Sequence, residues 1–240
     1  MSVSRVHPRE DQVAELTRGQ SLPLGPIRGF HLMFIAEVLT RASEDLLSKW
    51  PATLLSGGET EINALIESRL NTLLDEDKLW SQLVRCVARG KETVSYDGSH
   101  LEKQPDLSIY LTYRTPSFPL VVECKLIDAP SGKKIELYCS QGLARFLRGE
   151  YAWAVREAFM LGYVRDGSTI FSCLKPFLAQ SKASKPDTYQ TEALPTSMPG
   201  HGSAELARSR HKRAFRYIGN PQNEPGTIAV WHLWTSFRPQ

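Results

Sequence analysis

The sequence has no long hydrophobic run, no signal-like start and little net charge. No stretch approaches the roughly 18 consecutive apolar residues that a membrane-spanning helix needs, so we expect no membrane partner. The start, MSVSRVHPREDQ, contains no apolar core, which favours a cytoplasmic protein. The net charge is only +3. Any nucleic-acid-binding surface must therefore be a local patch rather than a global field.

Cysteine pairs and internal repeats are also missing. The four cysteines are widely spaced and form no CxxC motif, which argues against a structural zinc site. What remains is an ordinary globular composition, with 41% hydrophobic and 23% charged residues among 240. That length suits one sizeable core, or one domain with additions.

Hydrophobic periodicity predicts an α/β fold with a small mixed β-sheet flanked by helices. Residues 79–89 fit either a continuing helix or the start of a strand. The predicted helices cover about 30–50, 59–77, 135–150 and 169–179. The predicted strands cover about 106–113, 120–126, 157–164 and 227–234.

Composition divides the chain into four segments. We expect an N-terminal helical segment at 1–52 and the main α/β core at 53–180. Residues 181–207 are rich in Ser, Pro, Thr and Gly, which predicts a flexible loop. A basic segment and a closing strand follow at 208–240. The aromatic residues of that closing segment are expected in the core, namely Trp231, Trp234 and Phe237.

Three charged side chains gather on two neighbouring strands. Alternation places Asp106 on one face of the first strand and Glu123 with Lys125 on one face of the second. If the strands pair across the turn at 114–119, these faces coincide. The alternative is a buried salt bridge between Lys125 and one carboxylate, because structural ion pairs also resemble sites.

A divalent cation would explain charges inside the apolar segment VVECKL, where an unpaired charge is costly. Two carboxylates suit Mg²⁺ or Mn²⁺. Such a metal stabilises charge on a phosphodiester and lowers the pKa of an attacking water. Lys125 could orient that water, or accept its proton if burial lowers the pKa of the lysine.

The motif resembles the PD-(D/E)XK nuclease superfamily, whose fold is called restriction-endonuclease-like. Pro105-Asp106 matches PD and Glu123-Cys124-Lys125 matches (D/E)XK, and the resemblance covers about residues 59–164. Two further matches are decoys: Glu76-Asp77-Lys78 lies at a polar helix end, and Pro186-Asp187 lies downstream of every triplet. Only the first pair has the right order on two predicted strands.

The resemblance implies a Mg²⁺- or Mn²⁺-dependent endonuclease, with DNA favoured over RNA, in bacterial restriction or phage defence. It also implies a further acid from the preceding helix. Among Glu59, Glu61 and Glu67, Glu59 falls nearest the apolar stripe, so we expect Glu59 to join Asp106 and Glu123 as a metal ligand. An acid in a first helical turn also complements the helix dipole, which is the alternative.

The resemblance further implies polar or basic residues after the triplet. Gln141 is the matching candidate for a catalytic role, and Arg145 lies at i+4 from it as a phosphate ligand. A solvated helix face is the alternative. A segment SRHxR before the closing strand also resembles bacterial nucleases of this type, which suggests phosphate contacts by His211 and Arg213. Basic runs are otherwise simply solvated.

Two other functions stay open. The fold could serve as a catalytically silent module that binds nucleic acid or a partner protein. It could also be a subunit that acts only within a larger defence complex. A nuclease with one active site per chain would favour a homodimer for cutting both strands.

Overall fold

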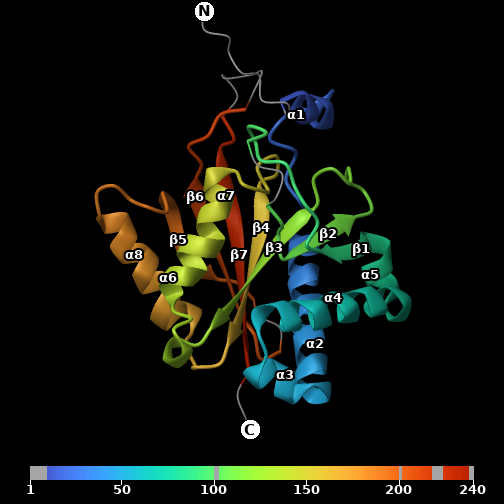
Figure 1. Cartoon of the computed structure of the whole chain (residues 1–240), viewed down its shortest axis with the longest axis vertical. Coiled ribbons are helices and arrows are strands. Elements are labelled where there is room, and N and C mark those ends of the chain that lie inside the picture. Colours follow the sequence, from blue (N-terminus) through green and yellow to red (C-terminus); the bar gives the residue numbers. More distant parts are fainter. Residues whose placement is uncertain (1–9, 100–102, 200–201, 218–223, 238–240) are drawn as a thin grey trace, which may run out of the picture.

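A computed structural model describes residues 10–99, 103–199, 202–217 and 224–237 of the chain. Within this part, one open mixed sheet is flanked by helices, which confirms the predicted α/β class (Figure 1). The strands are β1 (Val84–Arg89), β2 (Leu107–Leu111), β3 (Leu120–Ile127), β4 (Glu157–Val164), β5 (Thr191–Ser197), β6 (Glu205–Lys212) and β7 (Thr227–Ser236).

Eight α-helices are described, together with three short 3-10 or π-helical turns labelled η1, η2 and η3. In chain order these elements are α1 (Glu10–Thr17), α2 (Gly29–Lys49), α3 (Pro51–Ser56), α4 (Glu59–Glu76), α5 (Lys78–Leu83), η1 (Ala129–Ser131), α6 (Ile135–Tyr138), η2 (Cys139–Leu143), α7 (Ala144–Arg148), η3 (Ile170–Leu174) and α8 (Lys175–Ala183). No helix of the described residues is long and apolar enough to cross a membrane.

The sheet runs in the order β1-β2-β3-β4-β7-β6-β5. Its centre is parallel, because β4 pairs in parallel with both β3 and β7, while the outer pairs are antiparallel. Every residue of β3 and β4 is buried. Such strands are apolar on both faces because helices cover both. A charged residue in β3 therefore needs a partner inside the protein.

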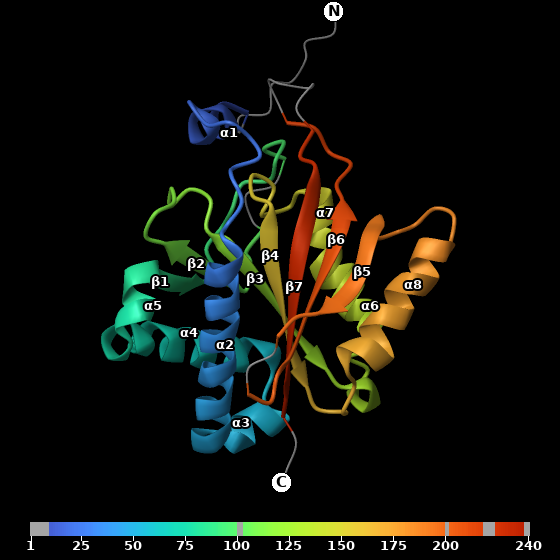
Figure 2. The ribbon, with the colours of Figure 1, turned by 180° about the vertical axis from the view of Figure 1, so that it is seen from behind.

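Two hydrophobic layers cover the two faces. Helices α2 and α4 pack on one face, and α2 lies on the near side of the sheet in Figure 2. Helices α6, α7 and α8 cover the other. Strand β3 alternates between them: Val122, Cys124 and Leu126 face α2 and α4, whereas Val121 and Ile127 face the opposite layer. The predicted parity of this strand is confirmed.

Several predicted elements need refinement. Residues 79–89 first continue as a helix and then form a strand, because α5 ends at Leu83 and β1 begins at Val84. The helix predicted at 135–150 is interrupted by the π-helical turn η2. The aromatic residues of the closing segment lie in the core as predicted, with Trp231, Trp234 and Phe237 each at most 2% exposed.

The predicted loop at 181–207 is wrong, because it contains β5 and the start of β6. The Ser, Thr and Pro content that suggested a loop belongs to an edge strand, where a proline such as Pro195 is tolerated. The predicted boundaries at 52 and 180 also fail. Helix α2 packs in the main core, and β7 lies in the middle of the sheet beside β4.

Candidate active site

Strands β2 and β3 separate after only three paired positions. Leu107 pairs with Val122 and Ile109 with Leu120, and no pairing with β2 continues along β3. Pro105 comes two residues before β2 and is buried. Because proline lacks an N–H donor, it interrupts a strand ladder. Since β2 does not run alongside this part of β3, the N–H groups of Cys124 and Leu126 need other acceptors.

Two carboxylates supply those acceptors. Asp106 Oδ2 accepts a hydrogen bond from the Cys124 N–H at 2.8 Å. Glu59 Oε2 accepts one from the Leu126 N–H, also at 2.8 Å. Each acid takes the place that a neighbouring strand would fill. Both side chains are thus fixed along the free edge of β3 by backbone bonds.

The ammonium of Lys125 lies among three carboxylates, and we name Glu59, Asp106, Glu123 and Lys125 the carboxylate cluster. Lys125 Nζ is 2.8 Å from Glu123 Oε1, 3.2 Å from Glu59 Oε1 and 3.4 Å from Asp106 Oδ2. It also donates to the Cys124 carbonyl at 2.7 Å. The three predicted core residues and the predicted helix acid therefore meet at one point.

Glu59 reaches the cluster from the opposite face of the sheet, because α4 packs with the α2 layer. The two alternative acids of this helix are occupied elsewhere. Glu61 accepts a hydrogen bond from the Gly58 N–H at its own helix start. Glu67 pairs with Arg89 at 3.5 Å. Of the three candidates, the structure brings only Glu59 to Lys125.

The decoy motifs have structural roles. Asp77 accepts from the N–H groups of Leu79 and Trp80, and so caps α5. Asp187 likewise accepts from the N–H groups of Tyr189 and Thr191. Both acids serve local backbone geometry, away from the carboxylate cluster.

Asn63 holds Asp106 and is itself held by Tyr163, and the sequence singled out neither residue. Asn63 Nδ2 donates to Asp106 Oδ1 at 3.0 Å, and Asn63 Oδ1 accepts from the Tyr163 hydroxyl at 2.8 Å. Asn63 lies one turn after Glu59 on α4, and it is buried beside Ile62 and Ile66. A polar residue next to an apolar stripe was the available signal.

Glu123 has its own set of partners on the other side of β3. Arg145 donates to Glu123 Oε1 at 3.1 Å and to the Tyr151 hydroxyl at 2.9 Å. The Tyr151 hydroxyl donates to Glu123 Oε2. The sequence predicts that Arg145 binds phosphate, and in the structure its side chain is one-third exposed while it pairs with Glu123. No periodic pattern pointed to Tyr151.

The charges of the carboxylate cluster alter two pKa values. Burial, then repulsion from Asp106, raises the pKa of Glu123 to about 7 against the attraction of Lys125. Burial alone would lower the pKa of Lys125, but the attraction of its carboxylate neighbours outweighs it and raises that pKa above the usual value. Lys125 thus stays protonated in this arrangement, which does not meet the condition for accepting a proton and leaves the role of orienting the water.

Gln141 lies in the π-helical turn η2, and its side chain is exposed. A π turn changes the angular spacing, so the predicted shared face of Gln141 and Arg145 does not follow. The turn lies close against the sheet at Gly142. A Cβ there would come within 2.6 Å of the Met160 side chain and 3.5 Å of Glu123 Cγ.

His211 is fully buried, so the predicted phosphate contact is wrong. Its Nδ1–H donates to the Tyr189 carbonyl at 2.8 Å, which leaves Nε2 to accept from the Ser209 hydroxyl at 2.8 Å. Ser209 Oγ accepts from His232 Nε2 at 2.7 Å, and His232 Nδ1 accepts from the Tyr138 hydroxyl at 2.9 Å. We name Tyr138, Ser209, His211 and His232 the histidine chain.

Arg213 is also buried, and the prediction of a phosphate contact is wrong here too. Its guanidinium donates to the carbonyls of Trp153 and Val155 at 3.2 and 3.0 Å, among other backbone oxygens. The exposed basic residues of β6 are Arg208, Arg210 and Lys212 on the alternate face. The basic segment is a strand whose alternation decides which side chains reach solvent.

Among the described residues, no group of three His, Cys, Asp or Glu side chains is already arranged to hold a metal ion. Comparison of the chain with protein-family models, with curated proteins and with solved structures finds no match. Any functional assignment therefore rests on the side chains themselves.

Proposed function

We propose that the chain is a metal-dependent endonuclease of the PD-(D/E)XK type, hydrolysing phosphodiester bonds of nucleic acid, with DNA favoured. The observation that carries the proposal is the convergence of Glu59, Asp106 and Glu123 on one cation position, within 3.4 Å of Lys125 Nζ. The order of these residues along the chain agrees with that type, with Glu59 on α4, Asp106 immediately before β2 and Glu123 on β3. Restriction or phage defence is the biological setting that the resemblance suggests.

The donor set suits a hard divalent cation. Three carboxylates face one ammonium and one guanidinium, so one negative charge is left over when all are ionised. Carboxylate oxygens are the ligands that Mg²⁺ and Mn²⁺ prefer. Bound there, the metal would supply charge stabilisation for the phosphodiester and a water of lowered pKa. Glu59, Asp106 and Glu123 are the residues that would hold it.

The chain's own groups have separate tasks in this proposal. Lys125 would leave the centre of the cluster and donate hydrogen bonds to the attacking water or to a phosphate oxygen. Arg145 would turn its exposed end toward a second phosphate oxygen. Tyr151 and Asn63 would keep the Glu123 and Asp106 carboxylates in place, because each already donates to one of them.

The direct test is a cleavage assay with purified protein and DNA in Mg²⁺, in Mn²⁺ and in chelator. Cleavage should require the metal and should be lost in Asp106→Ala and Lys125→Ala. A matched control is Asp187→Ala, because Asp187 belongs to the second PD motif but accepts hydrogen bonds from backbone N–H groups and the Ser181 hydroxyl, away from the carboxylate cluster. Cleavage that survives in Asp106→Ala and Lys125→Ala would contradict the assigned site.

Metal calorimetry addresses the alternative of a structural ion cluster or a silent module. A nuclease requires Mg²⁺ or Mn²⁺ binding that Asp106→Asn weakens. If the wild-type protein binds neither metal, Lys125 is a permanent structural counterion and the fold serves only for binding. Metal binding without cleavage would instead indicate a subunit that needs a larger complex.

A further inference from the structure

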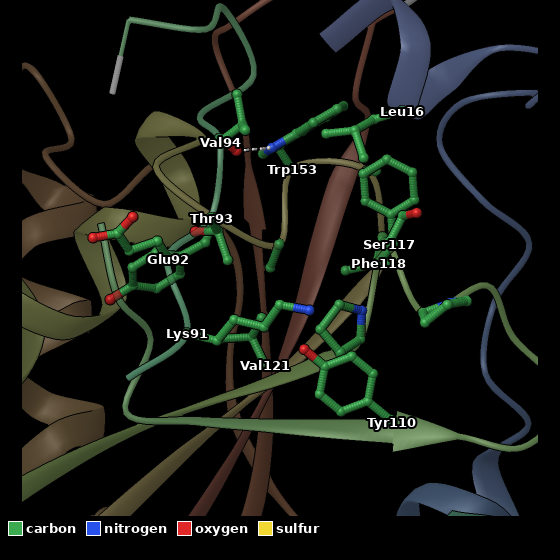
Figure 3. A pocket seen from close by; sticks show the side chains of 16 residues that line it. Leu16, Lys91, Glu92, Thr93, Val94, Tyr110, Ser117, Phe118, Val121 and Trp153 are labelled. Carbon is green, nitrogen blue, oxygen red and sulfur yellow. Dashed lines mark hydrogen bonds between the residues drawn. The ribbon is translucent and has the colours of Figure 1, made fainter. Parts of the chain in front are cut away.

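A pocket of about 330 Å³ lies on the same face of the sheet as Glu123. Its walls come from β2 and β3, the turn between them, and the segments at 91–94 and 151–155. Figure 3 shows Lys91, Val121 and Tyr110 on one side and Trp153 and Leu16 on the other. Its volume falls within the range of about 300–1,000 Å³ typical of small-molecule sites.

The lining is aromatic, with a cation at the rim. Tyr110, Phe118 and Trp153 are largely buried and form much of the wall. Lys91 Nζ lies 5.1 Å from the centre of the Tyr110 ring. The exposed rim also carries Glu92 and Ser117. A flat aromatic group attached to an anion fits this combination, because the ring can stack while the anion stays near the lysine.

The pocket adjoins the carboxylate cluster through two links. Tyr151 lines the pocket, and its hydroxyl donates to Glu123 Oε2. Val121 also lines the pocket, and Glu123 follows two residues later on the same face of β3. At about 3.3 Å per residue, the two side chains are roughly 7 Å apart along the strand. Arg145 also lies beside Tyr151, with its guanidinium carbon 6.0 Å from the Tyr151 ring centre.

We propose that this pocket binds one unpaired nucleobase of the substrate strand, beside the phosphate that the carboxylate cluster cleaves. The inference rests on the proposed function and names its substrate class: single-stranded or locally unpaired nucleic acid. A base inside the pocket cannot also be stacked and paired in a duplex. The aromatic lining recognises any base by its π face, so the pocket selects unpaired strands rather than a sequence.

The test measures binding without cleavage. Fluorescence anisotropy in Ca²⁺ buffer compares a labelled oligothymidylate with an abasic oligomer of equal length, which has the same phosphates. Wild-type protein should bind the oligothymidylate about ten-fold more tightly or better. Ser117→Leu fills the rim and Tyr110→Leu removes a stacking face, so each should reduce this preference. Ser184→Leu adds the same side chain at the exposed end of α8 and should not.

Three results would overturn the inference: equal binding of the two oligomers by wild type, an unchanged preference in Ser117→Leu, or free thymidine monophosphate binding as tightly as the oligothymidylate. The last result would make the ligand a free nucleotide. Base-dependent binding that Ser117→Leu removes supports the pocket even if wild type cleaves nothing. In that case the proposal of nuclease activity is contradicted, whereas the proposal of a nucleobase-binding pocket is supported.

Discussion

The carboxylate cluster and the histidine chain are both buried polar networks, and each joins several elements of the fold. In the histidine chain every donor finds an acceptor, from the Tyr138 hydroxyl to the Tyr189 carbonyl. Burial lowers the pKa of His211 to about 4 and that of His232 to about 3, so both rings are neutral. The network is closed and uncharged.

The carboxylate cluster differs in charge and in exposure. Its acids outnumber its cations, and the side chains of Glu59 and Asp106 are 32% and 24% exposed. A buried polar network that is neutral and complete contributes to folding. One that holds excess charge at an accessible strand edge can take up a cation. Charge balance and access, rather than burial, distinguish a candidate site from a structural network.

The largest expected effect is the loss of cleavage in the variant Glu123→Gln. Glutamine keeps the size of the side chain but removes the negative charge, and the pKa of about 7 means that Glu123 tolerates a neutral form. Cleavage should fall by about 10³-fold, while the melting temperature stays within a few degrees. Cleavage within ten-fold of wild type would remove Glu123 from the proposed metal ligands.

Lys125→Met should combine loss of cleavage with loss of stability. Removing the ammonium leaves the three carboxylates to repel one another, and removing one partner of a buried ion pair costs about 3–5 kcal/mol. Urea unfolding in chelator measures this loss. Added Mg²⁺ should restore part of the stability, because a cation replaces the ammonium. Stability that is independent of Mg²⁺ in this variant would argue against a metal site.

The pH dependence of metal binding separates the two networks further. Glu123 must be ionised to bind a metal, and its pKa is raised to about 7. Mg²⁺ affinity should therefore fall as the pH drops below about 7, by up to ten-fold per unit, and level off above it. Calorimetry at about pH 6, 7 and 8 measures this. The slope should disappear in Glu123→Gln, and the histidine chain should not contribute, because its pKa values lie near 3 and 4.

The smallest effect on cleavage is expected in the histidine chain. Ser209→Ala leaves the Nε2 atoms of His211 and His232 without their shared partner, which should cost about 1–3 kcal/mol of unfolding free energy. Cleavage at a temperature well below melting should stay within about two-fold of wild type. A large loss of cleavage with normal stability would show that the comparison between the two networks is wrong.

The sequence predicted what local periodicity controls. Alternation placed Glu123 and Lys125 on one face of β3, and the apolar stripe of α4 selected Glu59 over Glu61 and Glu67. Both inferences depend on angles between residues close in the chain. The meeting of Glu59 with Lys125 was suggested only by resemblance, because it depends on where β2 leaves β3.

The predictions that are wrong relied on composition and on a short motif. The basic content of residues 208–213 and the SRHxR resemblance predict phosphate contacts, whereas the alternation of a strand places His211 inside and Arg210 outside. The Ser, Thr and Pro content of residues 181–207 predicts a loop, whereas β5 and the start of β6 lie there. The contacts of Tyr151 with Glu123 and of Asn63 with Asp106 depend on packing between distant parts of the chain. Of these two residues, only Asn63 is indicated by the sequence, because it lies next to the apolar stripe of α4.

The π-helical turn η2 lies between α6 and α7 and places one additional residue in the helical segment that carries Arg145. A π turn holds one residue more than an α turn, so the extra residue bulges out and the helix on either side keeps its faces. If the turn became α-helical with that residue retained, every later side chain would rotate by about 100°. Arg145 would then turn away from Glu123. The contact between Arg145 and Glu123 thus depends on the π turn that takes up the extra residue.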